Sequence, residues 1–214
     1  GTWVRDSKVP PELWASLVAV MNGGFKLEHT NGGYVTEGTV VQALKPGRAT
    51  LAVDRAGHLI IGELGREIQD DGSWLTLRQN LRLIVDGGQP QLDKARAERV
   101  TWGAAEGGEP HVNRSAVCEL ADGRLAYFMA GLLDAPQLAE ALINVGCVKA
   151  VQLDINGSWP TFFTYELATT GEMTSQRLDR RMTINPQRFL TGASKDFFAF
   201  FDASLVPTPS VLDV

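Results

Sequence analysis

The chain has 214 residues, of which 44% are hydrophobic and 21% are charged, so it can build one substantial core and is too hydrophobic for bulk disorder. Its 20 Lys and Arg residues against 25 Asp and Glu residues give a net charge of −5, which argues against a general nucleic-acid-binding protein. No apolar run approaches the roughly 18 residues that a membrane-spanning helix needs.

The first third of the chain predicts short strands joined by tight turns. Several of its glycines occur in pairs, and paired glycines are typical of turns rather than of helices. Two adjacent prolines favour a helix start, because proline is tolerated in the first helical turn. In chain order we expect a short helix after Pro10-Pro11, a strand over 17–21 that stops at Asn22-Gly23-Gly24, an extended segment over 34–44, and a hairpin of 48–53 with 58–64.

The middle of the chain predicts a second hairpin, the clearest helix and a buried strand. Asp134 is a plausible N-cap, Leu138 and Leu142 give the helix one apolar face, and Gly146 stops it. The expected elements are a hairpin of 115–120 with 124–129, a helix from 134 to 145 and a strand over 148–153.

Few helices among many short strands predict an α+β fold, with a single domain built on a mixed and strongly twisted β-sheet core. No repeat or linker divides residues 1–170, which we expect to form the main domain. From about residue 169 the chain is more polar, and 171–214 is expected to be a C-terminal extension that packs on the same domain. Its apolar strip Phe197–Phe201 is interpreted as a core or closing strand; exposure would instead indicate a partner interface.

Cysteine and histidine usage predicts neither a metal site nor a cofactor. Cys118 and Cys147 lack the spacing of a zinc or redox site, and a disulfide and two buried thiols are both open interpretations. The three histidines lie far apart without ligand spacing. The chain contains no P-loop, no dinucleotide-binding fingerprint and no nucleophile elbow.

Two apolar strands end in amide or carboxylate side chains followed by glycine, at Met21–Phe25 and at Gln152–Trp159. Glycine lets a ligand approach the backbone, and strand ends position reactive groups more rigidly than loops do. The alternative is turn chemistry, because Asn and Asp routinely cap their own turns.

Two arginines stand beside apolar stretches, where a cation requires an anion. For Arg114 that anion is either a structural carboxylate or a bound phosphate, and Arg78, in Arg78-Gln79-Asn80, has the same ambiguity. The arginines between residues 177 and 188 fit either a solvated face paired with Asp179 and Glu172 or a surface for anionic glycan or lipid.

Taken in order, nine short blocks resemble the phosphodiester glycosidase family, and together they cover most of residues 17–160. The combination also resembles an actinobacterial, envelope-associated branch of that family. The blocks are 21–25, 32–34, 47–51, 57–62, 78–81, 83–88, 113–115, 122–125 and 150–154.

The resemblance implies hydrolysis of a sugar 1-phosphodiester to free sugar and phosphomonoester. We expect no cofactor and assign no metal-ligating residue. The resemblance makes Asp154 the catalytic carboxylate and Arg114 the catalytic phosphate-binding group. The sequence does not identify a second carboxylate, for which Glu63 and Asp86 are equal candidates. The substrate-binding residues that we expect for this reaction are Asn22, Gly23, Gly24, Arg78, Asn80, Asn156 and Trp159; of these, the resemblance matches Asn22 to the asparagine of the family's Asn-Gly-Gly block.

The leading hypothesis is therefore a monomeric hydrolase of a carbohydrate phosphodiester, outside the cell or in its envelope, with no nucleic-acid partner and no transmembrane segment. A targeting signal or anchor is expected outside this sequence. Residues 155–159 depart from the family's glycine run, which motivates a second hypothesis: a non-catalytic glycan- or phosphoglycan-binding module on the same fold. A structural envelope protein that uses Phe197–Phe201 as an interface is the third.

Overall fold

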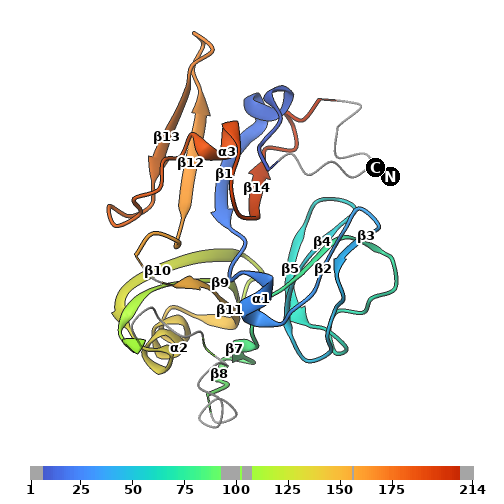
Figure 1. The fold of residues 1–214 in the computed structure, drawn as a ribbon, viewed down its shortest axis with the longest axis vertical. Coiled ribbons are helices and arrows are strands. Elements are labelled where there is room, and N and C mark those ends of the chain that lie inside the picture. Colours follow the sequence, from blue (N-terminus) through green and yellow to red (C-terminus); the bar gives the residue numbers. More distant parts are fainter. Residues whose placement is uncertain (1–6, 93–101, 103–107, 156, 208–214) are drawn as a thin grey trace. The chain divides into compact units, whose positions relative to one another are not determined.

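The computed structural model describes residues 7–92, 102, 108–155 and 157–207, and it forms two compact units (Figure 1). We call residues 1–23 with 157–214 the terminal unit and residues 24–156 the central unit. Many short strands and few helices confirm the predicted α+β class. The strand ladders are antiparallel, and an isolated parallel bridge joins Leu64 to Ile68. The domain boundary expected at residue 170 stays a prediction.

The first sheet of the central unit has the strand order β3-β2-β6-β4-β5. Its core packs Ala52, Leu64, Ile68 and Leu77. The hairpin predicted around residues 54–57 is confirmed, and the extended segment is a second hairpin whose turn, Glu37-Gly38, has positive φ at both residues. The elements here are α1 (Leu27–Thr30), β2 (Tyr34–Thr36), β3 (Thr39–Gln42), β4 (Ala49–Asp54), β5 (Leu59–Glu63) and β6 (Trp74–Gln79).

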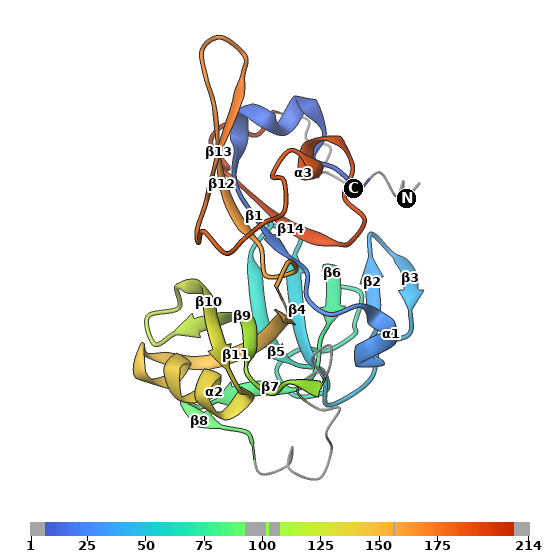
Figure 2. The same cartoon turned by 60° about the vertical axis from the view of Figure 1, so that its left-hand side comes forward.

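The second sheet of the central unit has the order β10-β9-β11-β7-β8, and helix α2 covers one of its faces (Figure 2). Asp134 caps α2 in a capping box: its carboxylate accepts from the Gln137 backbone N–H, and the Gln137 side chain accepts from the Asp134 N–H. The predicted hairpin, helix and strand are confirmed. The elements are β7 (Leu83–Asp86), β8 (Gln89–Pro90), β9 (Val112–Leu120), β10 (Leu125–Leu133), α2 (Ala135–Asn144) and β11 (Cys147–Ile155).

A disulfide between Cys118 and Cys147 joins β9 to β11 and decides between the two interpretations of the cysteines. Both residues are buried in the core beneath α2, beside Ala116 and Ala150. The bond ties together the two strands that carry Arg114 and Asp154.

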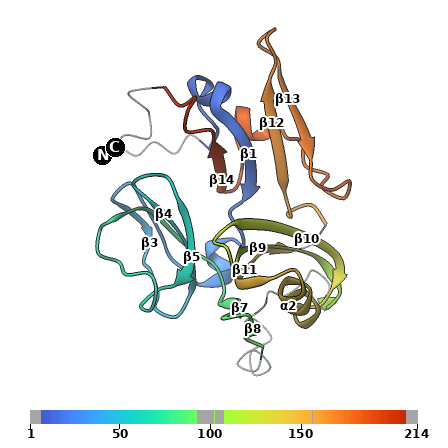
Figure 3. The same cartoon turned by 180° about the vertical axis from the view of Figure 1, so that it is seen from behind.

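The terminal unit is a four-stranded sheet of order β13-β12-β1-β14 (Figure 3). Strand β1 lies between two strands that come from much later in the sequence. The Phe197–Phe201 strip forms β14, a closing strand at the edge of this sheet, and its side chains are partly buried. The elements are η1 (Pro11–Ser16), β1 (Leu17–Asn22), β12 (Phe162–Leu167), β13 (Met173–Arg177), α3 (Arg188–Thr191) and β14 (Phe197–Phe201).

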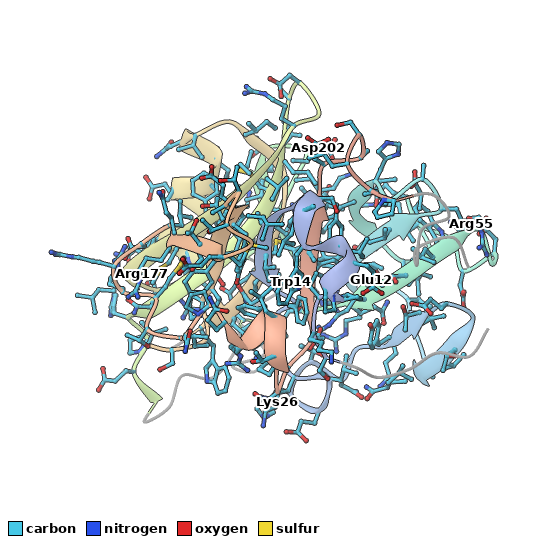
Figure 4. The ribbon with its side chains drawn as sticks, turned by 90° about the horizontal axis from the view of Figure 1, so that it is seen from above. Glu12, Trp14, Lys26, Arg55, Arg177 and Asp202 are labelled. Atoms are coloured by element: carbon cyan, nitrogen blue, oxygen red, sulfur yellow. A yellow bond between two sulfur atoms is a disulfide. The ribbon has the colours of Figure 1, made fainter. Side chains whose placement is uncertain are left out.

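Aromatic packing fastens β14 and α3 to the terminal unit. The Phe189 ring of α3 lies with its centroid 5.1 Å from that of Phe197 and 6.2 Å from that of Phe163 on β12. On the short helix η1, Trp14, labelled in Figure 4, donates from Nε1 to the Val9 carbonyl at 3.1 Å. In the part of the chain that the structure describes, no helix has the length and hydropathy needed to cross a bilayer.

Candidate functional site

Strand β11 is irregular where it delivers Asp154. Gln152 pairs with Ala116 and Ile155 pairs with Arg114, so β11 inserts one residue more than β9 over this interval. Such a bulge is typical of positions where a side chain is redirected next to a site. The Asp154 carbonyl accepts a hydrogen bond from Ser115 Oγ at 2.8 Å, and the Asp154 residue is only 5% exposed. The carboxylate therefore sits at a rigid, buried strand end.

The guanidinium of Arg114 is bound by carbonyl oxygens. Nε donates to Leu133 O at 2.7 Å, and Nη2 donates to Pro110 O at 3.1 Å. Nη1 donates to Trp102 O at 3.2 Å and to Gln152 Oε1 at 3.1 Å. Among the described residues, no carboxylate lies within ion-pair distance of Arg114, so the structural carboxylate that the sequence analysis allowed for is not found there.

Burial governs the electrostatics of Arg114, which is 4% exposed. Desolvation lowers the pKa of its guanidinium, and the negative charge of Asp134 opposes that shift. An arginine starts so far above neutral pH that it stays charged despite this. Because Arg114 pairs in register with Ile155, a permanent positive charge lies one residue from Asp154 along the ladder. Its predicted catalytic contact with phosphate stays a prediction.

Arg78 and Asn80 hold the backbone that follows Gly24. The guanidinium of Arg78, which is 1% exposed, donates to Phe25 O, to Gln79 O and to Asn80 Oδ1. Asn80 Oδ1 also accepts from Phe25 N–H at 3.2 Å. Gly24 has a φ of +111°, and a Cβ there would overlap the Asn80 side chain. These contacts explain the glycine; the substrate-binding roles predicted for the three residues stay predictions.

In the terminal unit, three segments meet at the end of β1. Asn22 N–H donates to Thr161 O at 3.1 Å, and Thr161 N–H donates to Asn22 Oδ1 at 3.1 Å. Thr161 Oγ1 binds the Trp159 carbonyl at 2.9 Å. Gly23 N–H donates to the Asp196 carbonyl at 3.1 Å, and a Cβ on Gly23 would overlap the Asp196 carboxylate.

Lys195 completes this group, because its Nζ lies 4.7 Å from the centroid of the Trp159 ring. Both side chains are partly exposed. We call Asn22, Gly23, Trp159, Lys195 and Asp196 the strand-end cluster. Sequence reasoning missed Lys195 and Asp196, since the only available signal was the neighbouring Phe197–Phe201 strip, and a strip does not reveal which strand it pairs with.

The structure thus distributes the predicted site residues over both units. Asn22, Gly23 and Trp159 come together in the terminal unit, whereas Gly24 with Arg78 and Asn80, and Arg114 with Asp154, belong to the central unit. Asn156 lies outside the described residues.

The two residues proposed as a second carboxylate lie near a surface ion-pair network. Asp86 accepts from Arg66 Nη1 at 2.7 Å, and this bond, together with the one that Arg66 donates to Glu67, raises the pKa of Arg66. Glu63 contributes its backbone N–H to Glu67 Oε2 at 2.9 Å. Neither contact adds support for a catalytic role, and the second carboxylate stays a prediction.

Among the arginines of segment 177–188, Arg181 forms the predicted surface pair, with its Nη2 2.8 Å from Asp179 Oδ2. Arg177, at the end of β13 (Figure 4), donates to the Met182 carbonyl at 3.1 Å. The described residues contain no group of three or more His, Cys, Asp and Glu side chains arranged to hold a metal ion.

The fold and the blocks along the chain agree with one known class of protein. Residues 15–177 match the model of the phosphodiester glycosidase family, so the chain belongs to this family and the predicted resemblance is confirmed. A search of curated proteins gives no match.

Among solved structures, the chain is similar to the catalytic domain of zebrafish N-acetylglucosamine-1-phosphodiester alpha-N-acetylglucosaminidase, auto-inhibited by its pro-peptide. The two share 20% identity with a TM-score of 0.53, and the match covers 85% of this chain and 62% of that one. At this identity the likeness shows the fold. A hypothetical protein from Synechocystis shares 11% identity over 75% of this chain and 49% of its own, with a TM-score of 0.46.

Proposed function

We propose that the protein is a hydrolase of the phosphodiester glycosidase type that cleaves a sugar 1-phosphodiester in a cell-envelope or exopolysaccharide glycan. In this reaction the bond between the anomeric carbon and the phosphate oxygen breaks. Water supplies the new hydroxyl of the sugar, and the acceptor leaves as a phosphomonoester. The observation that carries the proposal is the family match over residues 15–177, which includes Asp154 at the bulged end of β11.

Asp154 is the carboxylate in this proposal. A carboxylate beside the anomeric carbon either assists the attacking water or stabilises an oxocarbenium-like transition state. Its support is positional: a buried strand end, with the Asp154 carbonyl held by Ser115, keeps the residue in a fixed place.

Arg114 contributes positive charge that favours departure of the phosphate group. Four of its N–H groups are engaged with Leu133, Pro110, Trp102 and Gln152, so the same contacts also hold the strands and loops around it. Removing Arg114 would therefore alter stability as well as charge, and this makes Asp154 the cleaner residue for testing the chemistry.

An extracellular or envelope location, and a monomeric state, belong to the same proposal. The disulfide between Cys118 and Cys147 supports the location, because disulfides persist in oxidising compartments and are rare in the cytosol. The carbohydrate phosphodiester is the expected partner, and the first compound to test is an N-acetylglucosamine 1-phosphodiester, the substrate class named for the zebrafish relative.

The test is a screen of several sugar 1-phosphodiesters for release of free sugar and phosphomonoester, with Asp154→Asn beside the wild-type protein. We expect the substitution to lower kcat at least about 100-fold, because it removes the charge and the proton-transfer capacity of the group. Asp122→Asn is the matched control, since Asp122 is an exposed turn residue paired with Arg124 at 2.8 Å. If the wild-type protein releases product from none of the diesters, the proposal that it is a hydrolase is wrong.

A second candidate is a non-catalytic glycan- or phosphoglycan-binding module on the same fold. The departure of residues 155–159 from the family's glycine run favours it, because bulkier residues there would change how a substrate fits after Asp154. This candidate predicts saturable binding of envelope glycan fragments without product release. Hydrolysis that disappears in Asp154→Asn would eliminate it.

A further inference from the structure

A positive charge favours binding of a phosphodiester, and both predicted arginines are deeply buried. Arg78 is 1% exposed and Arg114 is 4% exposed. The hydrogen bonds described for both run to carbonyl oxygens of the chain. Such contacts fit arginines that hold neighbouring segments of the chain in place, so a more exposed cation is a further candidate for contact with the phosphate.

Lys195 lies among residues already predicted to bind the substrate. It directly precedes Asp196, whose carbonyl accepts from Gly23 N–H, and its ammonium stands over the Trp159 ring. Strand β14 fixes this placement, because Phe197 pairs in register with Asn22. A cation over an indole ring thus belongs to the two segments, around residues 159–161 and 195–197, that bind the end of β1.

The chemistry of this group suits a phosphorylated sugar. An ammonium is a compact point charge with three N–H donors, and an aromatic face within about 6 Å attracts it without neutralising its charge. Indole rings also offer apolar surface to the faces of sugar rings, and the Asp196 carboxylate can accept hydrogen bonds from hydroxyl groups. The charges of Lys195 and Asp196 cancel overall, so selectivity for an anion has to come from direct contact rather than from a broad positive field.

We propose that Lys195 binds the phosphate of a sugar 1-phosphate group and is a specificity-determining residue that favours phosphorylated sugars over neutral ones. The identity of the ligand rests on the proposed function. Lys195 lies beyond residues 15–177, the part of the chain that matches the family model. The positive charge in this proposal therefore comes from the segment leading into β14, whereas Asn22 and Trp159 lie within the matched region.

The test measures binding by calorimetry with three probes: glucose 1-phosphate, glucose and inorganic phosphate. We expect the wild-type protein to bind glucose 1-phosphate more tightly than glucose. Lys195→Gln should weaken binding of both phosphate-bearing probes about tenfold, the loss of one charge-assisted hydrogen bond, and leave glucose unchanged. Lys195→Arg should retain most of the affinity. Lys149→Gln is the matched control, because Lys149 lies near Glu67 at 3.9 Å in the central unit.

Two results would overturn the proposal: a wild-type protein without preference for the phosphorylated sugar, or Lys195→Gln binding both phosphate probes as tightly as the wild type. A folding defect in Lys195→Gln would appear as a lowered melting temperature. Lys195→Arg keeps the positive charge, so it separates loss of the charge from a general effect of substitution at this position. If the probes bind as expected but no diester is hydrolysed, the hydrolase fails and the role of Lys195 stands. If Asp154→Asn abolishes turnover while Lys195→Gln binds both phosphate probes as tightly as the wild type, the hydrolase stands and the proposed role of Lys195 is wrong.

Discussion

The ends of β1 and β11 look alike in sequence and differ in the structure. Both are apolar strands that finish with Asn or Asp followed within a few residues by glycine. At the end of β11, Ser115 and Arg114 bind backbone carbonyls and are buried. At the end of β1, Asn22 binds the backbone of Thr161, and the partly exposed Lys195 lies over the partly exposed Trp159 ring in the same unit.

We interpret this difference in exposure as a sign that the two cations have different roles. A buried guanidinium with carbonyl partners stabilises the fold and lends its charge from a fixed position. A partly exposed ammonium over an aromatic ring can exchange contacts with a ligand at little structural cost. The three predictions below test this contrast, from the largest effect on stability to the smallest.

Phe189→Ala tests whether the β1 end depends on aromatic packing from the C-terminal segment. Phe189 is 4% exposed and packs on Phe163 and Phe197, so truncation should lower the free energy of unfolding by about 4 kcal/mol. Urea denaturation measures the loss. Binding of glucose 1-phosphate should weaken as well, since Phe197 and Lys195 belong to one segment. A loss below about 1 kcal/mol would mean that the site can relax around the cavity.

Arg114→Met tests the structural role of the buried guanidinium. The substitution keeps a long side chain but leaves the carbonyls of Leu133, Pro110 and Trp102 without this donor, and we expect a loss of about 3 kcal/mol. Arg124→Met is the control: the Arg124 side chain is 76% exposed, and the change should stay within about 0.5 kcal/mol. Equal effects of the two substitutions would contradict the contrast.

Asp179→Asn tests a surface ion pair, between Asp179 and the exposed Arg181. Hydrogen bonds from Arg181 lower the pKa of Asp179 from 3.8 to about 2. A carboxyl whose pKa falls on folding stabilises the folded state above its unfolded pKa, and that contribution disappears as the pH falls through the folded pKa.

The wild type should therefore exceed Asp179→Asn in stability at neutral pH by less than about 1 kcal/mol, as exposed ion pairs do. The gap should close between pH 3.8 and about 2, which urea denaturation across this range would show. A difference in stability between the wild type and Asp179→Asn that grows as the pH falls would contradict the ion pair of Asp179 with Arg181.

Local features of the fold could be predicted because their interactions join residues close in the sequence. Asp134 and Gln137 form their capping box within one helical turn, and the hairpins around residues 54–57 and 122–123 close over short turns. Asp154 was predicted as the catalytic carboxylate from the order of short blocks that the family shares. The family model confirms that the chain belongs to this family. The role of Asp154 in the chemistry is still to be measured.

The partners of Arg114 and the place of Lys195 could not be predicted in this way. Arg114 gathers carbonyls from residues 102, 110 and 133 together with a side chain from residue 152, and no local pattern records that convergence. Lys195 reaches the β1 end only because β14 pairs with a strand more than 170 residues earlier.

The sequence by itself determined the α+β class, the short strands and their turns, the cap of α2 and the family, because each depends on local geometry or on motif order. The tertiary structure decided which residues are buried with carbonyl partners, that Cys118 bonds to Cys147, and that Lys195 stands over Trp159. The physical reason is that strand pairing and packing join residues far apart in the chain, and their free energy is set by burial and register rather than by neighbours in sequence.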